Sequence, residues 1–251
     1  MRFSSIVSFL FVGLLAAPVT ATPLTAAVAA NEIELARSLL QAGADVNELD
    51  AELESPLGFA VRNGSPALVE LLLSRGATVD KPNGIGVRPL HVAAANGRTA
   101  IVKLLLDKGA DLNATNAHSA TALGVAVQEG RADIVQLLLS RGAAVDARNV
   151  HQATPLHIAA QLGREDLAIL LLDHRASIDA ANSVGATPLH LAAEAGMVDV
   201  VMLLLARGAD RNARNQSGST AVDMAVPGNP VLPLLRVGTA PAADAPAVAP
   251  Q

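Results

Sequence analysis

The chain has 251 residues and contains no cysteine, no tryptophan and no tyrosine. Without cysteine it can form no disulfide bond, no thiolate metal site and no cysteine nucleophile. Aromatic residues make up only 2%, and three of the four phenylalanines (Phe3, Phe9 and Phe11) lie within the first eleven residues. The hydrophobic core of the remaining chain must therefore be built from Ala, Leu, Val and Ile, with Phe59 as its only aromatic side chain.

Charge is also scarce and is of mixed sign. The chain carries 18 Lys and Arg against 23 Asp and Glu, a net charge of −5, and these residues are spread along the sequence without blocks. A nucleic-acid-binding face needs clustered basic residues, so we expect no nucleic-acid partner. Hydrophobic residues make up 51%, which is too many for a chain that is disordered throughout.

The beginning of the sequence has the pattern of an export signal. Arg2 precedes an apolar run over residues 6–17, and small residues follow at Val19 and Ala21. A short basic start, roughly 7–15 apolar residues and small residues before the cleavage point define a secretory signal peptide. A transmembrane anchor would need about 20 apolar residues. We therefore predict that residues 1–21 are a signal peptide cleaved near Ala21. The mature protein is then periplasmic or secreted and has no integral membrane anchor.

The rest of the sequence has a period of 33 residues. Thr-Pro-Leu or a related triplet begins at residues 22, 55, 88, 121, 154, 187 and 220. A Gly-Ala pair keeps the same phase, beginning at Gly43, Gly76, Gly109, Gly142 and Gly208. A fixed period of this length predicts a solenoid, in which each repeat buries its hydrophobic faces only against its neighbours.

Two repeats carry the fullest form of the motif, TPLHIA from Thr154 and TPLHLA from Thr187. With its 33-residue period, the chain resembles the ankyrin-repeat family over residues 22–236. The resemblance implies an all-α solenoid of stacked helix–turn–helix units with β-hairpin tips, made of six full repeats and a truncated C-terminal cap. It also implies a module that binds a protein partner. No Ser/His/Asp set stands apart from the repeat pattern, so we expect a non-catalytic protein without a cofactor. We also expect the protein to be a monomer.

The residues of single repeats predict their local structure. Thr154 can cap a helix through its hydroxyl, and Pro155 suits the first helical turn. Gly163 allows the left-handed turn that ends this helix. At the hairpin tips, Asn149 and Asn182 are expected to adopt a positive φ, which Asn tolerates.

Both ends of the repeat region depart from the pattern. Ala26 and Ser38 stand where the other repeats have larger apolar residues, which predicts the exposed outer face of an N-terminal cap. Prolines are expected to reduce the second helix of the last repeat to a short turn around residues 231–236. The Ala/Pro-rich segment 237–251 is predicted to be a disordered tail. Arg175 replaces a turn glycine and is expected to carry backbone strain.

Several polar residues could carry chemistry. By the resemblance, His91, His157 and His190 are structural and tie each helix start to the adjacent turn. His118 and His151 lie at successive hairpin tips, which leaves open an alternative function as a small-ligand or metal-binding carrier. A zinc site would need further ligands, which are not evident.

Three acidic residues alternate at the first hairpin tip, at Asp50, Glu52 and Glu54. This spacing is typical of the start of a calcium-binding loop, but the required glycine and the acidic residue at position 12 are missing. We therefore expect a solvated tip here and no metal.

The family resemblance places a partner-binding groove on the hairpin tips and the exposed side of the first helices. Transferred by position, this predicted face comprises Ile85, Val87, His118, Gln128, Arg148, Val150, His151, Gln161, Leu162, Val184 and Glu194. Its middle repeats combine apolar tips with Arg148, and we expect the partner to bind there. The partner is either an exported enzyme that the protein accompanies or a toxin that it inhibits as an immunity-type protein.

The signal-peptide hypothesis predicts a defined product. The exported protein should begin at Thr22, so its intact mass should lack residues 1–21. Mass spectrometry of the protein recovered from the exported fraction measures this directly. A full-length product retained in the membrane would contradict the hypothesis.

Overall fold

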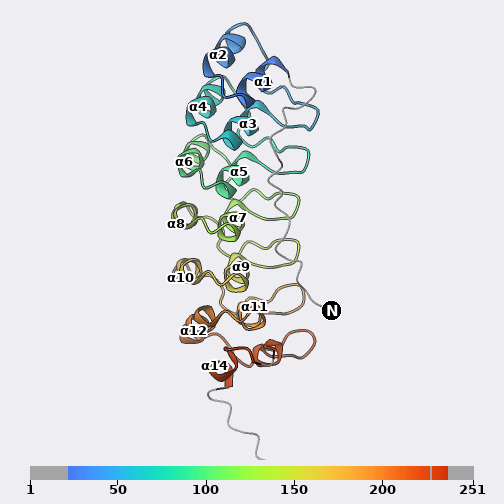
Figure 1. Cartoon of the computed structure of the whole chain (residues 1–251), viewed down its shortest axis with the longest axis vertical. Helices are drawn as coiled ribbons and strands as arrows, with labels where there is room; N and C mark the ends of the chain where they lie inside the picture. Colours follow the sequence, from blue (N-terminus) through green and yellow to red (C-terminus); the bar gives the residue numbers. More distant parts are fainter. Residues whose placement is uncertain (1–21, 227, 237–251) are drawn as a thin grey trace, which may run out of the picture.

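The computed structural model describes residues 22–226 and 228–236, which form a single stack of short helices (Figure 1). The described helices are α1 (Pro23–Ala29), α2 (Ile33–Gln41), α3 (Pro56–Asn63), α4 (Pro66–Ser74), α5 (Pro89–Ala95), α6 (Thr99–Asp107), α7 (Ala122–Gln128), α8 (Ala132–Ser140), α9 (Pro155–Gln161), α10 (Glu165–Asp173), α11 (Pro188–Ala195), α12 (Val198–Ala206), α13 (Ala221–Met224) and α14 (Leu232–Arg236). The predicted signal segment 1–21 and tail 237–251 lie outside the described residues.

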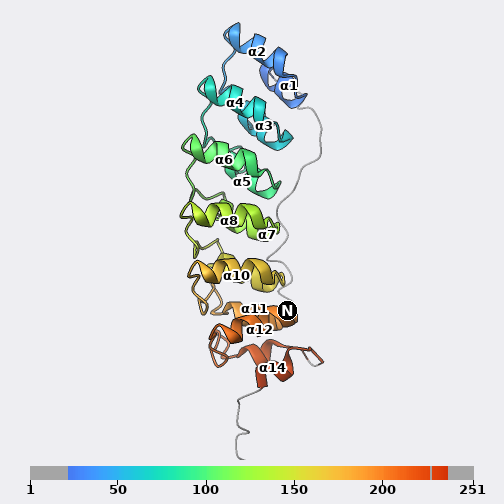
Figure 2. The ribbon, with the colours of Figure 1, turned by 90° about the vertical axis from the view of Figure 1, so that its left-hand side faces the viewer.

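The helices form two parallel columns, one repeat above the next. The first helices of the repeats, α1 to α11 in odd numbers, make the central column of Figure 1, and the second helices α2 to α12 lie on its left. Figure 2 shows the second helices from the front. The loops that join successive repeats project to the right of Figure 1. Within the described residues the β-pairing of these loops is a single bridge, between Thr115 and Thr121, so the expected hairpins are turns without strands.

The first helices begin as the sequence predicts. Thr154 is the N-cap of α9, Pro155 occupies its first turn, and Thr154 forms a capping box with His157. The Ser55 hydroxyl accepts a hydrogen bond from the Gly58 amide at 3.1 Å in the same way. These contacts satisfy amides that have no partner inside the helix. Gly163 follows α9 with a φ of 66°, which confirms its predicted left-handed turn.

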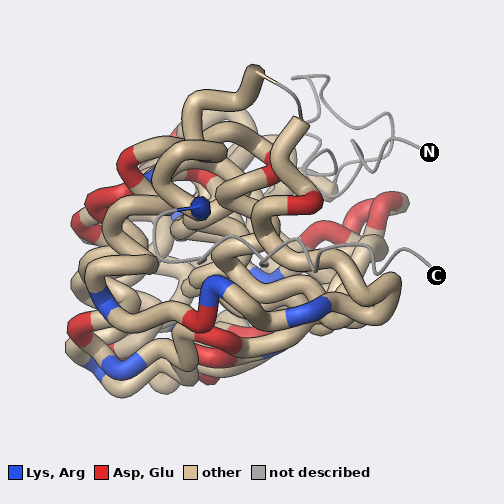
Figure 3. Tube along the Cα trace, turned by 90° about the horizontal axis from the view of Figure 1, so that it is seen from below, with Lys and Arg blue, Asp and Glu red and all other residues tan. Residues whose placement is uncertain are grey.

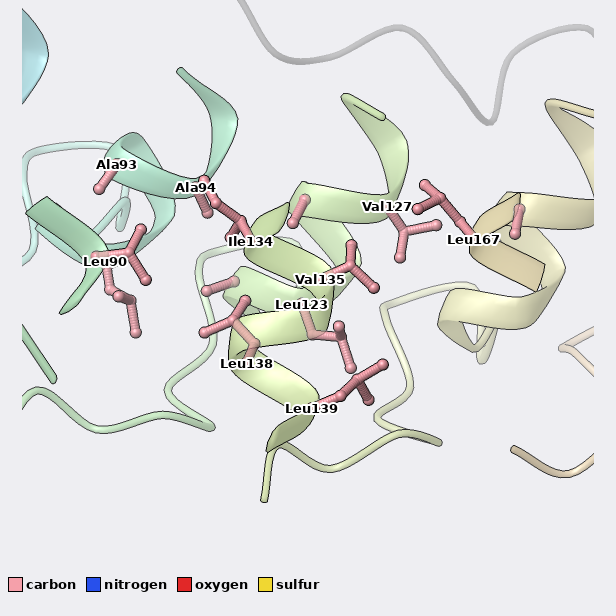
Figure 4. Close-up of a cluster of buried hydrophobic side chains, with 14 of the residues drawn as sticks. Leu90, Ala93, Ala94, Leu123, Val127, Ile134, Val135, Leu138, Leu139 and Leu167 are labelled. Carbon is pink, nitrogen blue, oxygen red and sulfur yellow. The ribbon is translucent and has the colours of Figure 1, made fainter. Parts of the chain in front are cut away.

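The hydrophobic core runs through the stack without interruption between repeats. Figure 4 shows its central part, where side chains of α7 and α8 meet those of the repeats on either side. Leu138 and Val135 of α8 are completely buried, as is Leu167 of the following repeat. Aliphatic side chains form this part of the core. They include small residues such as Ala93 and Ala94, which let the first helices lie close to one another.

The two ends of the stack close it in different ways. Ala26 and Ser38 are exposed at the N-terminal end, which confirms the predicted polar outer face of the first repeat. At the C-terminal end, Val231 and Leu235 of the shortened last repeat are completely buried and belong to the hydrophobic core. Among the described helices none is both long and apolar enough to cross a membrane.

Two predictions about backbone conformation have different outcomes. Arg175 has a φ of 65°, so the expected left-handed conformation is confirmed. The prediction for Asn149 and Asn182 is wrong, because the positive φ falls three residues later, at Gln152 (56°) and Gly185 (73°). The asparagines stabilise the tip through their side chains instead. Each Oδ1 accepts two backbone N–H bonds within its own turn, at 2.9–3.0 Å for Asn149 and 3.0 Å for Asn182.

Burial of the core predicts the effect of truncating it. Leu138→Ala should lower the free energy of unfolding by about 2–5 kcal/mol, because it leaves a cavity between two repeats. Urea denaturation followed by circular dichroism measures this change. The matched control Gln136→Ala, an exposed residue of the same helix, should change the free energy of unfolding by no more than about 0.5 kcal/mol. A loss as small as the control's would contradict the packing described.

Candidate partner-binding face

The residues predicted to bind a partner are accessible and fall into two groups. Ile85, Val87, His118, Arg148, Val150, His151 and Val184 lie in the loops between repeats, whereas Gln128, Gln161, Leu162 and Glu194 lie at the C-terminal ends of first helices. None of them is buried. A seven-residue helix is about 10 Å long and separates the second group from the loops that precede it. The structure places the first group in successive loops and the second group at the other ends of the first helices.

Backbone hydrogen bonds join the tips of successive loops. The amide of Val150 donates to the carbonyl of His118 at 3.0 Å, and the amide of Ser183 donates to the carbonyl of His151 at 2.9 Å. The amide of Gln216 continues this ladder to the carbonyl of Val184 at 3.0 Å. The tips from the third to the sixth repeat therefore form one connected row.

A second ladder of hydrogen bonds joins the bases of the same loops. One polar side chain per repeat accepts the amide that lies 31 residues further along the chain. The side chain of Asn113 accepts from Ala144 at 2.9 Å, and that of Asp146 accepts from Ser177 at 3.0 Å. Because base and tip are both tied to the next repeat, the loops are ordered before a partner arrives, which lowers the entropic cost of binding.

Large apolar side chains are exposed along this row of tips. Ile85 is 69% exposed, Val150 50% and Val184 44%. Leu53, at 53%, extends the row towards the N-terminus and was not among the predicted residues. It stands two residues before a repeat start, where later repeats have Gly86 or Gly185. An alignment of the repeats could have identified Leu53, because a large apolar residue at an exposed turn position cannot pack against the core.

Arg148 has a structural role in the row that its sequence position did not reveal. Its Nη1 donates to the carbonyl of Gln152 in its own loop at 3.1 Å and to that of Ala181 in the next loop at 2.7 Å. The side chain is exposed and also connects two loops. Its removal would therefore disturb the row as well as any contact with a partner.

Three histidines, His91, His157 and His190, tie the start of a first helix to the loop that ends the same repeat, as the resemblance implied. In His157, Nδ1 accepts the amide of Thr154 at 3.1 Å, so Nε2 carries the proton and donates to the carbonyl of Ala186 at 3.0 Å. His190 makes the equivalent pair of contacts, ending on Ser219. Burial lowers the pKa of His157 to about 4. Its ring is therefore neutral at pH 7, as this hydrogen-bonding pattern requires.

The acidic alternation at the first tip is not solvated, contrary to expectation. Asp50 and Glu54 are buried, at 5% and 7% exposure, and only Glu52 is exposed. Asp50 takes the position of the tip asparagines and accepts the amides of Glu52 at 3.0 Å and Glu54 at 2.7 Å. The expectation was wrong because the same Oδ1 geometry that orders the other tips turns Asp50 inward.

Glu54 is held by residues distant in sequence. Its carboxylate pairs with Arg62 and accepts a hydrogen bond from Nδ2 of Asn83 at 3.2 Å. The Arg62 guanidinium also lies over the Phe59 ring, 5.3 Å from its centre. Burial raises the pKa of Glu54, and the charge of Arg62 opposes this shift. These partners explain how a carboxylate is accommodated beneath the tip.

The hairpin-tip histidines are not gathered into a metal centre. His118 and His151 are both exposed on successive tips. Within the part of the chain that the structure describes, no three His, Asp or Glu side chains are placed to hold one metal ion.

Comparison with known proteins places this geometry in a family. The model of ankyrin repeats (3 copies) matches residues 4–83, 24–116, 79–149, 123–215 and 174–236. The human ASB11 ankyrin-repeat domain is similar in structure, with a TM-score of 0.79, 32% identity and coverage of 88% of this chain and 99% of that domain. The ankyrin-repeat domain of Bcl-3, a member of the IκB protein family, has a TM-score of 0.77 and 31% identity, with 86% and 98% covered. No curated protein matches the chain.

The buried histidine predicts how stability depends on pH. The native state of His157 takes up a proton only near pH 4, whereas the unfolded chain does so near the ordinary pKa of 6.5. Between these values the unfolded state binds more protons, so stability should fall as the pH is lowered from 6.5 to 4. The full contribution is about 3 kcal/mol. Denaturant unfolding at a series of pH values measures it.

His157→Gln should flatten this pH dependence, because Gln keeps the capping box and does not titrate. The matched control is His118→Gln, which changes an exposed histidine at a loop tip and should leave the pH profile as in the parent. Equal profiles for the parent and His157→Gln would show that the ring does not act in this way.

Proposed function

The chain belongs to the ankyrin-repeat family, and from this premise we propose that it is an exported protein that binds a protein partner along its row of loop tips. Ankyrin-repeat domains generally mediate protein–protein interaction, and the family is typically non-enzymatic. We propose three things beyond the family: that the protein is exported, that it binds a protein partner, and that the loop tips make the contact.

The observation that carries the proposal is the row of exposed apolar tips. Leu53, Ile85, Val150 and Val184 expose between 44% and 69% of their surface, and all four lie in loops between repeats. Single exposed apolar residues are ordinary, but a succession on one ordered edge is typical of an interaction surface. The described chain has no Trp or Tyr to act as an anchor, so aliphatic contacts must supply the binding energy.

The proposed place of action follows from the first residues of the chain. Residues 1–21 have the composition of a signal peptide, which supports a periplasmic or secreted protein. Two roles fit such a protein, an accessory partner that stabilises an exported enzyme and an immunity-type inhibitor that blocks a toxin. Addition of the purified protein to its captured partner distinguishes them, because the partner's activity is preserved in the first case and lost in the second.

The tips provide the test of the binding face. The double variant Val150→Ser and Val184→Ser should weaken binding of the captured partner at least tenfold, because two aliphatic contacts at the centre of the row are lost. Both side chains are about half exposed, so the thermal midpoint should change little. Surface plasmon resonance with the immobilised partner measures the affinity, and circular dichroism measures the thermal midpoint.

Met202→Ser is the matched control for this test. Met202 is 45% exposed and belongs to α12, in the column of second helices on the side opposite the loops (Figure 1). Its replacement should leave partner binding unchanged. If Met202→Ser abolishes binding and the double tip variant retains it, the partner binds the second helices and the proposed face is wrong.

A further inference from the structure

The C-terminal end of the solenoid contains a cleft that the row of tips does not include. The cleft has a volume of about 590 Å³ and lies between the last loop and α14. Arg211 and Arg214 line it from the loop, and Arg236 lines it from the end of α14. Figure 3 views the molecule onto this end, with basic and acidic positions coloured. Ligand sites commonly have volumes of roughly 300–1,000 Å³.

Arg211 breaks the repeat pattern at a position where every earlier repeat has an aliphatic residue. Its counterparts, all of which pack against the core, are Val46, Val79, Leu112, Val145 and Ile178. Nη1 of Arg211 is buried, and no residue in the described structure hydrogen-bonds it. A buried donor without an acceptor destabilises the folded state, and a valine at this position would not have this effect. Packing against the core therefore does not explain the arginine.

Arg214 adds a second guanidinium whose contacts are incomplete by comparison with an earlier repeat. Its counterpart Arg148 donates to a carbonyl in its own loop and to Ala181 in the next loop. Arg214 makes the first of these contacts, to the carbonyl of Gly218 at 2.6 Å. The described residues do not include a following loop to provide the second acceptor.

One carboxylate, Asp223, also lines the cleft. It stands at the position that His157 and His190 hold in other repeats, and its Oδ2 accepts the amide and the hydroxyl of Thr220, both at 2.8 Å. These hydrogen bonds lower its pKa, so Asp223 is charged at neutral pH. The lining of the cleft contains three arginines and one aspartate, in a chain whose net charge is −5.

We propose that this cleft binds an oxyanion, the carboxylate or phosphate group of a ligand, with Arg211 as its main donor. A guanidinium presents its N–H groups in a planar fork that matches both kinds of oxyanion. Arg214 and Arg236 surround the same space, and Val222 offers an apolar wall to the body of the ligand. The oxyanion would accept hydrogen bonds from Arg211, which lines the cleft.

Calorimetric titration of the full chain tests the proposal, with pyrophosphate and with succinate as separate probes at fixed ionic strength. We expect saturable binding of one or both anions and a rise in the thermal midpoint when that anion is present. Binding of pyrophosphate alone identifies a phosphate site, and binding of succinate alone identifies a carboxylate site. The absence of saturable binding by either probe would overturn the proposal.

Arg211→Val restores the aliphatic residue of the earlier repeats, so the variant should fold with an unchanged or higher thermal midpoint. It should weaken anion binding at least tenfold. Arg211→Lys keeps the charge without the planar fork and should give an intermediate affinity. The matched control Arg75→Gln removes one positive charge from an exposed site at the end of α4. Equal losses in Arg211→Val and Arg75→Gln would show a general charge effect and would overturn the assignment.

Discussion

Each helix pair in this chain is covered by the pair that follows it, and this contact fixes the spacing of the repeats along the sequence. The hydrogen bond from His157 Nε2 crosses to a carbonyl 29 residues ahead, and the Asp146 side chain reaches an amide 31 residues ahead. The first contact spans the repeat that begins at Thr154, and the second joins that repeat to the one before it. An inserted residue between the partners would displace one end of each bond, and it would leave the buried Nε2 of His157 without its acceptor. The constant period of 33 residues is the consequence.

The sequence was sufficient to predict the features that depend on a single repeat or on its immediate neighbour. The helix starts at Thr154 and Pro155, the turn at Gly163 and the exposed cap at Ser38 follow from local hydrogen bonding and from the lack of a preceding repeat. The conformation of the tips was less predictable. Asparagine can stabilise a turn through its backbone or its side chain, and the sequence alone does not distinguish the two for Asn149.

Four repeats lack the histidine. Two of these four have glycine in its place, and they show why side-chain placement could not be predicted from the pattern. Gly58 replaces it in one repeat, and a Cβ there would lie 1.8 Å from a carboxylate oxygen of Glu54, so the Glu54 side chain occupies the space beside the helix start. Gly124 replaces it in another, where a Cβ would be 4.0 Å from Cδ1 of Ile158, with no carboxylate nearby. The same substitution therefore has two structural outcomes, which depend on residues in the adjoining loop and the next repeat.

In such a solenoid, the positions that stacking does not determine are those where a specific function can be encoded. Three such positions are occupied by Ile85, Val184 and Arg211. The stacking of repeats does not require these side chains, and they are not stabilised by the core. Their backbones are nevertheless fixed by the ladders that the repeat imposes, for example from Gln216 to Val184. Binding at these positions therefore orders few backbone groups. The periodic contacts that stabilise the stack also lower the entropic cost of recognition at its edge and at its end.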